Sequence, residues 1–135
     1  MTPFALLATA FTLTGPAFSA GGTIPKRYTC VGADVSPPLR WTAPPRGTAS
    51  LALTMVDVSV GFLHWQALRI PPTTRRLPAG AKLAHESLNS FQQRGYGGPC
   101  PPPGPAHRYV FAIRALAASG RVLAEASLAG RFGRG

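Results

Sequence analysis

Prolines and glycines interrupt this sequence so often that little room is left for long helices. The chain of 135 residues contains 15 of each, and neither is periodic, which excludes a collagen-like repeat. With 45% hydrophobic and 13% charged residues, the chain is too apolar for a disordered tail, and its length suits one domain. We therefore expect short strands joined by turns, as in an all-β sandwich or barrel.

Alternating hydrophobicity predicts the strands. They cover residues 11–14, 51–57, 64–70 and 107–115. In each of the last three, every second residue, counted from the first, would lie on one core-facing row. Residues 121–126 are the only candidate for a helix. Neither an internal repeat nor a linker is visible, so residues 1–135 are interpreted as a single domain.

Four polar residues lie at the ends of these predicted rows. Asp57 ends one row, His64 begins another, and His107 and Tyr109 begin a third. Side chains in such positions are neither deep in the core nor free in water, and a sandwich would place a pocket there. Taken alone, a histidine such as His64 is more commonly a satisfied core residue than a ligand-binding one.

A loop rich in glycine and proline precedes the last of these strands. Residues 95–109 read Gly-Tyr-Gly-Gly-Pro-Cys-Pro-Pro-Pro-Gly-Pro-Ala-His-Arg-Tyr. Such residues fix a rigid, irregular backbone that is able to aim N–H groups at an anion. A plain structural turn and a polyproline ligand for another domain are the alternatives.

Together with other motifs, this loop carries a family resemblance. The motifs are, in order, Tyr28–Leu39, Trp41, Leu51–Asp57, Phe62–Trp65, Ile70–Pro72 and the loop with its His-Arg-Tyr. In this order they resemble the phosphatidylethanolamine-binding protein family, and within it the bacterial branch related to Raf kinase inhibitor proteins. The loop is highly specific to that branch, and the resemblance extends over nearly the whole chain.

The resemblance implies a Greek-key-like β-sandwich with at most one or two short helices and an anion pocket near its surface. The ligand-binding residues it implies are Asp57, His64, Pro101, Pro102, His107 and Tyr109, with Trp41 and Phe62 on the apolar rim. The ligand would be phosphate, a carboxylate or a phospholipid head group. Imidazole and phenol groups suit such an anion, and Asp57 is able to orient a histidine ring. We expect neither a cofactor nor a metal, although Asp57 and the two histidines would be the ligands of one.

The two cysteines are Cys30 and Cys100, and neither belongs to a CxxC pair, which argues against a zinc site or a redox motif. From the residues alone, two thiols and one long-range disulfide both stay open. The resemblance places both cysteines in motifs beside the pocket and implies a pair. A bridge would need Cα atoms about 4.4–6.8 Å apart.

The sequence departs from the family pattern in two places. Asp57-Val58-Ser59 stands where the family usually has Asp-Pro-Asp, so a second carboxylate is absent, and the loop from Asp57 to His64 is short. A segment usual in the bacterial branch, including a helix, is missing after Ala117. We expect an altered pocket mouth and apolar surface exposed by the missing helix.

We interpret the protein as a binding module for a small anionic ligand rather than an enzyme, with inhibition of a kinase or another enzyme as a further role and an unknown protein partner. One alternative is a hydrolase in which His64 or His107 is the base and Asp57 orients it. No Gly-x-Ser-x-Gly motif is present to supply a nucleophile. Another alternative is a nucleic-acid or anionic-membrane surface binder driven by the net charge of +10. Because the arginines are scattered, nucleic acid is not the expected partner.

The apolar segment Met1–Ala20 ends in Ala-Phe-Ser-Ala, which resembles a signal-peptidase site. No Lys or Arg precedes Lys26, so the charged n-region of a signal peptide is missing. We therefore expect a cytoplasmic location, with export as the alternative and residues 1–10 disordered or part of a targeting segment. No uninterrupted apolar stretch is long enough to span a membrane.

Overall fold

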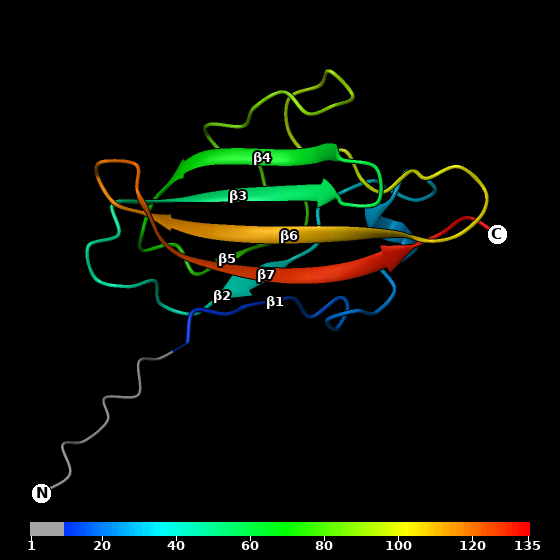
Figure 1. The fold of residues 1–135 in the computed structure, drawn as a ribbon. Coiled ribbons are helices and arrows are strands. Elements are labelled where there is room, and N and C mark those ends of the chain that lie inside the picture. The colour runs from blue at the N-terminus through cyan, green and yellow to red at the C-terminus, as the bar shows by residue number, and fades with distance from the viewer. Residues whose placement is uncertain (1–9) are drawn as a thin grey trace, which may run out of the picture.

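Two antiparallel sheets form the protein (Figure 1), and the computed structural model describes residues 10–135 of it. The smaller sheet has the order β1 (Leu13–Thr14), β2 (Leu39–Trp41), β5 (Arg76–Leu77). The larger has the order β4 (Phe62–Ile70), β3 (Ser50–Asp57), β6 (His107–Leu116), β7 (Val122–Phe132). In the described part of the chain the one helical element is the 3-10 turn η1 (Lys26–Tyr28). The prediction of an all-β fold is confirmed.

The core lies between the two sheets, and its buried side chains come from both. On β3 and β6 the fully buried side chains include Leu53, Met55, Phe111 and Ile113, which lie on the predicted rows, while Ala52 and Thr54 of the other face are also largely buried. Burying a large apolar side chain contributes about 1.5–3 kcal/mol. The residues on the predicted rows of β3 and β6 therefore form the core-facing side of the larger sheet.

Residues 11–20 belong to this folded domain. Leu13 is buried in β1, and the ring of Phe18 packs against Phe111 with 5.9 Å between ring centroids. Cleavage after Ala20 would remove both side chains from the core. The expectation of a disordered or targeting segment at residues 1–10 falls, apart from Ala10, outside the described residues. Within the described part, no helix is long and apolar enough to cross a membrane.

Strand β4 does not keep the predicted alternation. Its core-facing residues are Trp65, Ala67 and Ile70, whereas Gln66 is half-buried and Leu68 is exposed. Two register shifts against β3 cause the difference. A bulge adds one residue to one strand, and a slip of one residue exchanges the two faces. His64 lies at such a shift, between the β3-paired residues Leu63 and Trp65, and this position lets it be buried next to Trp65.

The helix predicted at residues 121–126 is wrong, because this segment is the beginning of β7. Strand β7 pairs with β6 from Val122 to Phe132. The connection is a tight turn in which Ala117 N–H donates to the Arg121 carbonyl and Gly120 has a φ of 91°. Local helix propensity is weak compared with a long ladder to a neighbouring strand. The hairpin thus closes directly after Ala117, where the resemblance implies that a segment is missing.

Candidate functional site

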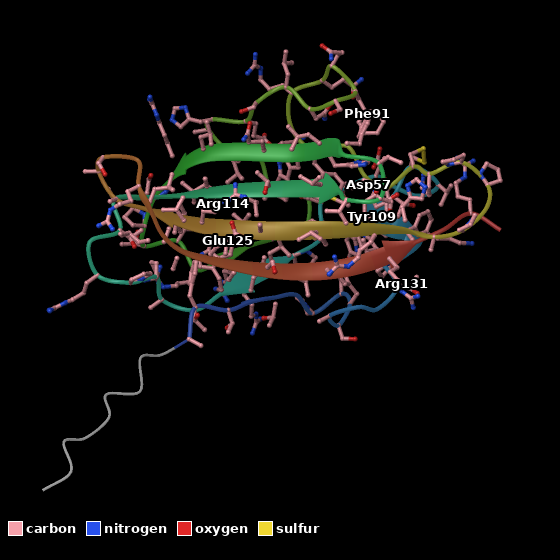
Figure 2. All side chains as sticks on the ribbon, viewed as in Figure 1. Asp57, Phe91, Tyr109, Arg114, Glu125 and Arg131 are labelled. Atoms are coloured by element: carbon pink, nitrogen blue, oxygen red, sulfur yellow. A yellow bond between two sulfur atoms is a disulfide. The ribbon has the colours of Figure 1, made fainter. Side chains whose placement is uncertain are left out.

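The strand ends at one edge of the larger sheet surround a cavity. Asp57 at the end of β3 is the cross-strand partner of Phe62 on β4 and of Tyr109 on β6. Figure 2 shows Asp57 and Tyr109 at the same end of the sheet, with Phe91 on the loop beside β4. The cavity has a volume of about 310 Å³, and its lining residues are Asp57, Val60, Phe62, His64, Phe91, Cys100, Pro101, Pro102, His107 and Tyr109.

Asp57 orients His107 within this cavity. Its Oδ2 lies 2.6 Å from Nδ1 of His107, while its Oδ1 accepts a hydrogen bond of 2.9 Å from the Ser59 N–H. The Ser59 hydroxyl in turn accepts from the Arg108 N–H at 3.0 Å. Because Nδ1 is engaged with the carboxylate, Nε2 is the ring nitrogen of His107 that is free for a ligand. Ser59 therefore connects the Asp57 carboxylate to the backbone of β6 at Arg108.

His64 is held by the loop that follows residue 95. Its Nδ1 lies 2.7 Å from the Gly97 carbonyl oxygen, and the Gly97 N–H donates to the His64 carbonyl at 3.0 Å. A carbonyl only accepts, so Nδ1 carries the proton and Nε2 is left as an acceptor in the neutral ring. Burial lowers the pKa of His64 below its ordinary value, although the Gly97 carbonyl and the charge of Asp57 act in the opposite direction.

Tyr109 lies between the two histidines. Its ring centroid is 5.3 Å from that of His64 and 6.4 Å from that of His107. The residue is fully buried, and its hydroxyl has no hydrogen-bond partner among the residues that the structure describes. Burial, assisted by the nearby charge of Asp57, raises the pKa of Tyr109 and keeps the hydroxyl protonated. An unpartnered buried hydroxyl costs about 1–3 kcal/mol unless something binds to it.

The wall of the cavity is formed by Cys100, Pro101 and Pro102. Cys100 forms a disulfide with Cys30, whose Cα atom is 5.3 Å away. The same loop is held by the Cys30 N–H, which donates to the Pro99 carbonyl, and by the Asp34 carboxylate, which accepts from the Gly98 N–H. The disulfide and these hydrogen bonds connect the wall to the segment that follows η1.

Comparison with known proteins agrees with this arrangement. Residues 14–133 match the family model described as phosphatidylethanolamine-binding protein. The chain belongs to that family. A relative from Aquifex aeolicus, named a UPF0098 protein, is 37% identical, with 87% of this chain and 85% of the relative covered. In Mycobacterium tuberculosis, a relative that bears the name lipoprotein LppC is 39% identical over 78% of this chain and 55% of its own length.

A solved structure is similar over nearly the whole chain. It is a phosphatidylethanolamine-binding protein homologue, CT736, from Chlamydia trachomatis, with a TM-score of 0.83 and 33% identity. The alignment covers 95% of this chain and all of CT736. The relatives and this structure place the chain in the bacterial branch of the family.

Among the residues expected from the resemblance, seven line the cavity and one does not. Those that line it are Asp57, Phe62, His64, Pro101, Pro102, His107 and Tyr109. Trp41 is the exception, because it is buried in β2 of the other sheet, where its indole N–H donates to the Thr74 carbonyl at 2.8 Å. Its expected place on the rim is wrong: the indole is hydrogen-bonded to the segment just before β5 instead.

Sequence reasoning missed Phe91 and Val60. The ring of Phe91 lies 4.7 Å from that of Phe62 and 5.3 Å from that of His64. It comes from the long segment between β5 and β6, which carries no periodic signal, so only the folded chain brings it to the cavity.

Among residues 10–135, no group of three or more His, Cys, Asp or Glu side chains is arranged to hold a metal ion.

Proposed function

We propose that this member of the phosphatidylethanolamine-binding protein family binds a small oxyanion, such as a phosphate monoester or a carboxylate, in the cavity at Asp57. One observation carries the proposal: two histidines with one free ring nitrogen each line the same cavity as Tyr109, a buried residue whose hydroxyl has no partner in the described part of the chain. The Tyr109 hydroxyl would donate to an anion oxygen. His107, paired with Asp57, would donate from Nε2 when its ring is protonated.

The protonation state of His64 determines how it would contact a bound anion. In the neutral ring of His64, Nε2 is an acceptor, which suits a ligand that carries its own proton, such as hydrogen phosphate. An anion without such a proton favours the charged imidazole and raises the pKa of His64. Binding would then be accompanied by proton uptake, and affinity would rise as the pH falls.

The size and lining of the cavity limit the ligand. A volume of about 310 Å³ is at the lower end for small-molecule sites. Phe62, Phe91 and Val60 line it beside the polar groups. A head group or a short ester would fit there, with an apolar part against the phenylalanines, whereas a whole phospholipid would not.

A pair of tyrosine variants tests the proposal, with inorganic phosphate and phosphoethanolamine as probes. Backbone amide shifts in a two-dimensional NMR titration locate binding at each residue. Tyr109→Phe removes the unpartnered hydroxyl, so we expect phosphate affinity at the cavity to fall about tenfold with no loss of folding stability. Tyr96→Phe is the matched control, because its buried hydroxyl donates to the Tyr28 carbonyl outside the cavity. It should cost about 1 kcal/mol of stability and leave affinity unchanged.

Two results would count against the proposal. One is a phosphate titration in which the amides of β3, β4 and β6 at the cavity do not shift. The other is an affinity at the cavity that Tyr109→Phe and Tyr96→Phe lower equally.

The cavity favours binding over hydrolysis. No serine, threonine or free cysteine is among its lining residues in the described part of the chain, so the pair Asp57–His107 has no side-chain nucleophile to activate. We propose that the protein is not an enzyme. Turnover of an activated aryl ester or aryl phosphate that His107→Ala abolishes would refute this. Inhibition of a kinase or another enzyme would need a partner surface that the cavity does not define.

We also propose that the protein works in an oxidising compartment. Structural disulfides persist there and are rare in the cytosol. The bridge between Cys30 and Cys100 supports this proposal, and the lipoprotein name of the mycobacterial relative agrees with it. Thiol alkylation of rapidly acidified cells, followed by mass measurement, should find both cysteines protected. Two alkylated cysteines would favour the cytoplasm.

A further inference from the structure

The carboxylates of this protein are all engaged within the fold. There are four, against 14 lysines and arginines. Asp34 accepts from the Gly98 N–H, and Asp57 pairs with His107. Glu86 accepts from the indole of Trp65, and Glu125 pairs with Arg114, labelled beside it in Figure 2. Arg114 is thus the one lysine or arginine side chain of residues 10–135 that forms a salt bridge to a carboxylate.

Two of the arginines without a carboxylate lie directly opposite each other. Arg40 on β2 and Arg76 on β5 are cross-strand partners in the antiparallel register, and both are exposed. Side chains in directly opposed positions have Cβ atoms roughly 4.5–5.5 Å apart, and like charges placed there destabilise the pairing. The neighbouring pair, Leu39 and Leu77, faces the core, so the two guanidinium groups point to the outside of the smaller sheet.

This pair lines a groove. Its volume is about 500 Å³, and it is bounded by Pro16, Pro38, Leu39, Arg40, Arg76, Leu77 and Pro78. Prolines lack a backbone N–H, so the two guanidinium groups are the strongest hydrogen-bond donors of the groove. The backbone beneath is well anchored, since the Trp41 N–H donates to the Arg75 carbonyl at 2.9 Å and the Trp41 indole to the Thr74 carbonyl.

We propose that this groove is a second anion-binding site, in which Arg40 and Arg76 together hold one phosphate or sulfate group. Planar guanidinium groups bind tetrahedral oxyanions through paired N–H donors. A doubly charged oxyanion between them would also cancel the repulsion of the opposed arginines. The site shares no lining residue with the cavity at Asp57 and does not depend on the function proposed for that cavity.

Arginine side-chain NMR gives the direct test, with inorganic phosphate and inorganic sulfate as separate probes. We expect saturable shifts of the Arg40 and Arg76 Nε–H signals with both anions, since both are tetrahedral and multiply charged. Acetate, which is planar and singly charged, should bind the groove at least several-fold more weakly. Linear, unsaturated shifts of all exposed arginines would mean that only the net charge attracts anions, and would overturn the proposal.

Matched variants separate this site from general charge. The double variant Arg40→Gln/Arg76→Gln should lower the affinity for sulfate at the groove by about tenfold or more, the scale of a lost charge-assisted bond. Arg46→Gln/Arg121→Gln removes the same charge from exposed positions in two turns and should leave that affinity unchanged. Equal losses in both double variants would refute the site.

The protonation behaviour distinguishes the two sites. Arginine stays charged at moderate pH, so sulfate binding at the groove should not vary between about pH 5 and 8. Tyr109→Phe should leave it intact. A groove affinity that follows pH, or that disappears in Tyr109→Phe, would show that the arginines report only on the cavity at Asp57.

Discussion

At the scale of single residues, hydrogen bonds within the protein decide which polar atoms of the cavity are free to bind a ligand. Asp57 uses one carboxylate oxygen for His107 and the other for the Ser59 N–H. The Nδ1 atom of His64 is hydrogen-bonded to the Gly97 carbonyl. These bonds leave three atoms for a ligand: the Nε2 atoms of the two histidines and the hydroxyl of Tyr109. A cavity whose polar side chains are already held in place by the fold is preorganised for a small ligand.

Replacing His107 with alanine should weaken anion binding without changing the fold. We expect Tyr109 and His64 to remain in place, and phosphate affinity to fall by about 1.5–3 kcal/mol, the range for a hydrogen bond to a charged group. Isothermal titration calorimetry at constant ionic strength measures the loss. His85→Ala is the control, since His85 is exposed and lies outside the cavity lining. An unchanged affinity in His107→Ala would place the phosphate elsewhere.

The lowered pKa of His64 makes two opposite predictions about pH. Without ligand, the unfolded chain takes up a proton near the ordinary pKa of 6.5 while the folded protein resists it, so the contribution of His64 to stability is lost as the pH falls below that value. With sulfate, which keeps its charge over this range, the bound anion favours the protonated ring, and the stabilisation by ligand grows as the pH falls.

Melting temperatures with and without sulfate, measured between about pH 5 and 8, test both statements. His64→Gln should remove the contribution of this residue to the pH dependence in each series. If the stabilisation by sulfate is the same at both ends of the range, the histidines take no part in binding.

At the scale of elements, irregularities position the site. The register shift in β4 brings His64 to the cavity, and the loop of residues 95–106 closes the wall. Loops that carry binding residues are effective when a rigid scaffold holds them. Here the scaffold consists of the disulfide, the Asp34 carboxylate and two hydrogen bonds between His64 and Gly97, one between their backbones and one from the imidazole Nδ1 to the Gly97 carbonyl.

We expect the main effect of the disulfide to be a higher free energy of unfolding. Its cysteines are 70 residues apart, and closing a loop of that length stabilises by roughly 4 kcal/mol in the chain-entropy model. We expect the urea midpoint to fall when the protein is reduced, and Cys30→Ser/Cys100→Ser to give the same midpoint with or without reductant. A midpoint of the native chain that reduction leaves unchanged would contradict this expectation.

At the scale of the whole molecule, charge is the dominant property. A net charge of +10 combined with four internally engaged carboxylates leaves the surface basic. Such a surface attracts any polyanion through counterion release, without reading a sequence. The two proposed anion sites differ from this background because each has a defined lining and a small number of donors.

Binding to nucleic acid should therefore be weak and strongly dependent on salt. We expect duplex DNA of unrelated sequences to bind equally at low ionic strength, and the affinity to fall steeply as salt approaches about 0.15 M, because each phosphate contact releases a counterion. Fluorescence anisotropy over a salt series measures the slope. Tight binding to one sequence at physiological salt would make nucleic acid a genuine partner.

Sequence alone determined the class of fold and most of the cavity. Frequent prolines and glycines exclude long helices, and alternation on the segments that became β3 and β6 identifies their core faces. Asp57, His107 and Tyr109 could be placed at the edge of a sheet because period-two alternation is a local property of the chain.

Only the tertiary structure decided the rest, because it depends on pairing between distant segments. The register shifts of β4 arise from its pairing with β3, so the local sequence pattern does not predict which residues of β4 face the core. Residues 122–126 form strand rather than helix because β6 lies beside them. For the same reason, Trp41, which was expected at the rim, lies in the smaller sheet, and Phe91, for which no role was expected, lines the cavity. The opposition of Arg40 and Arg76 likewise exists only in the register between β2 and β5.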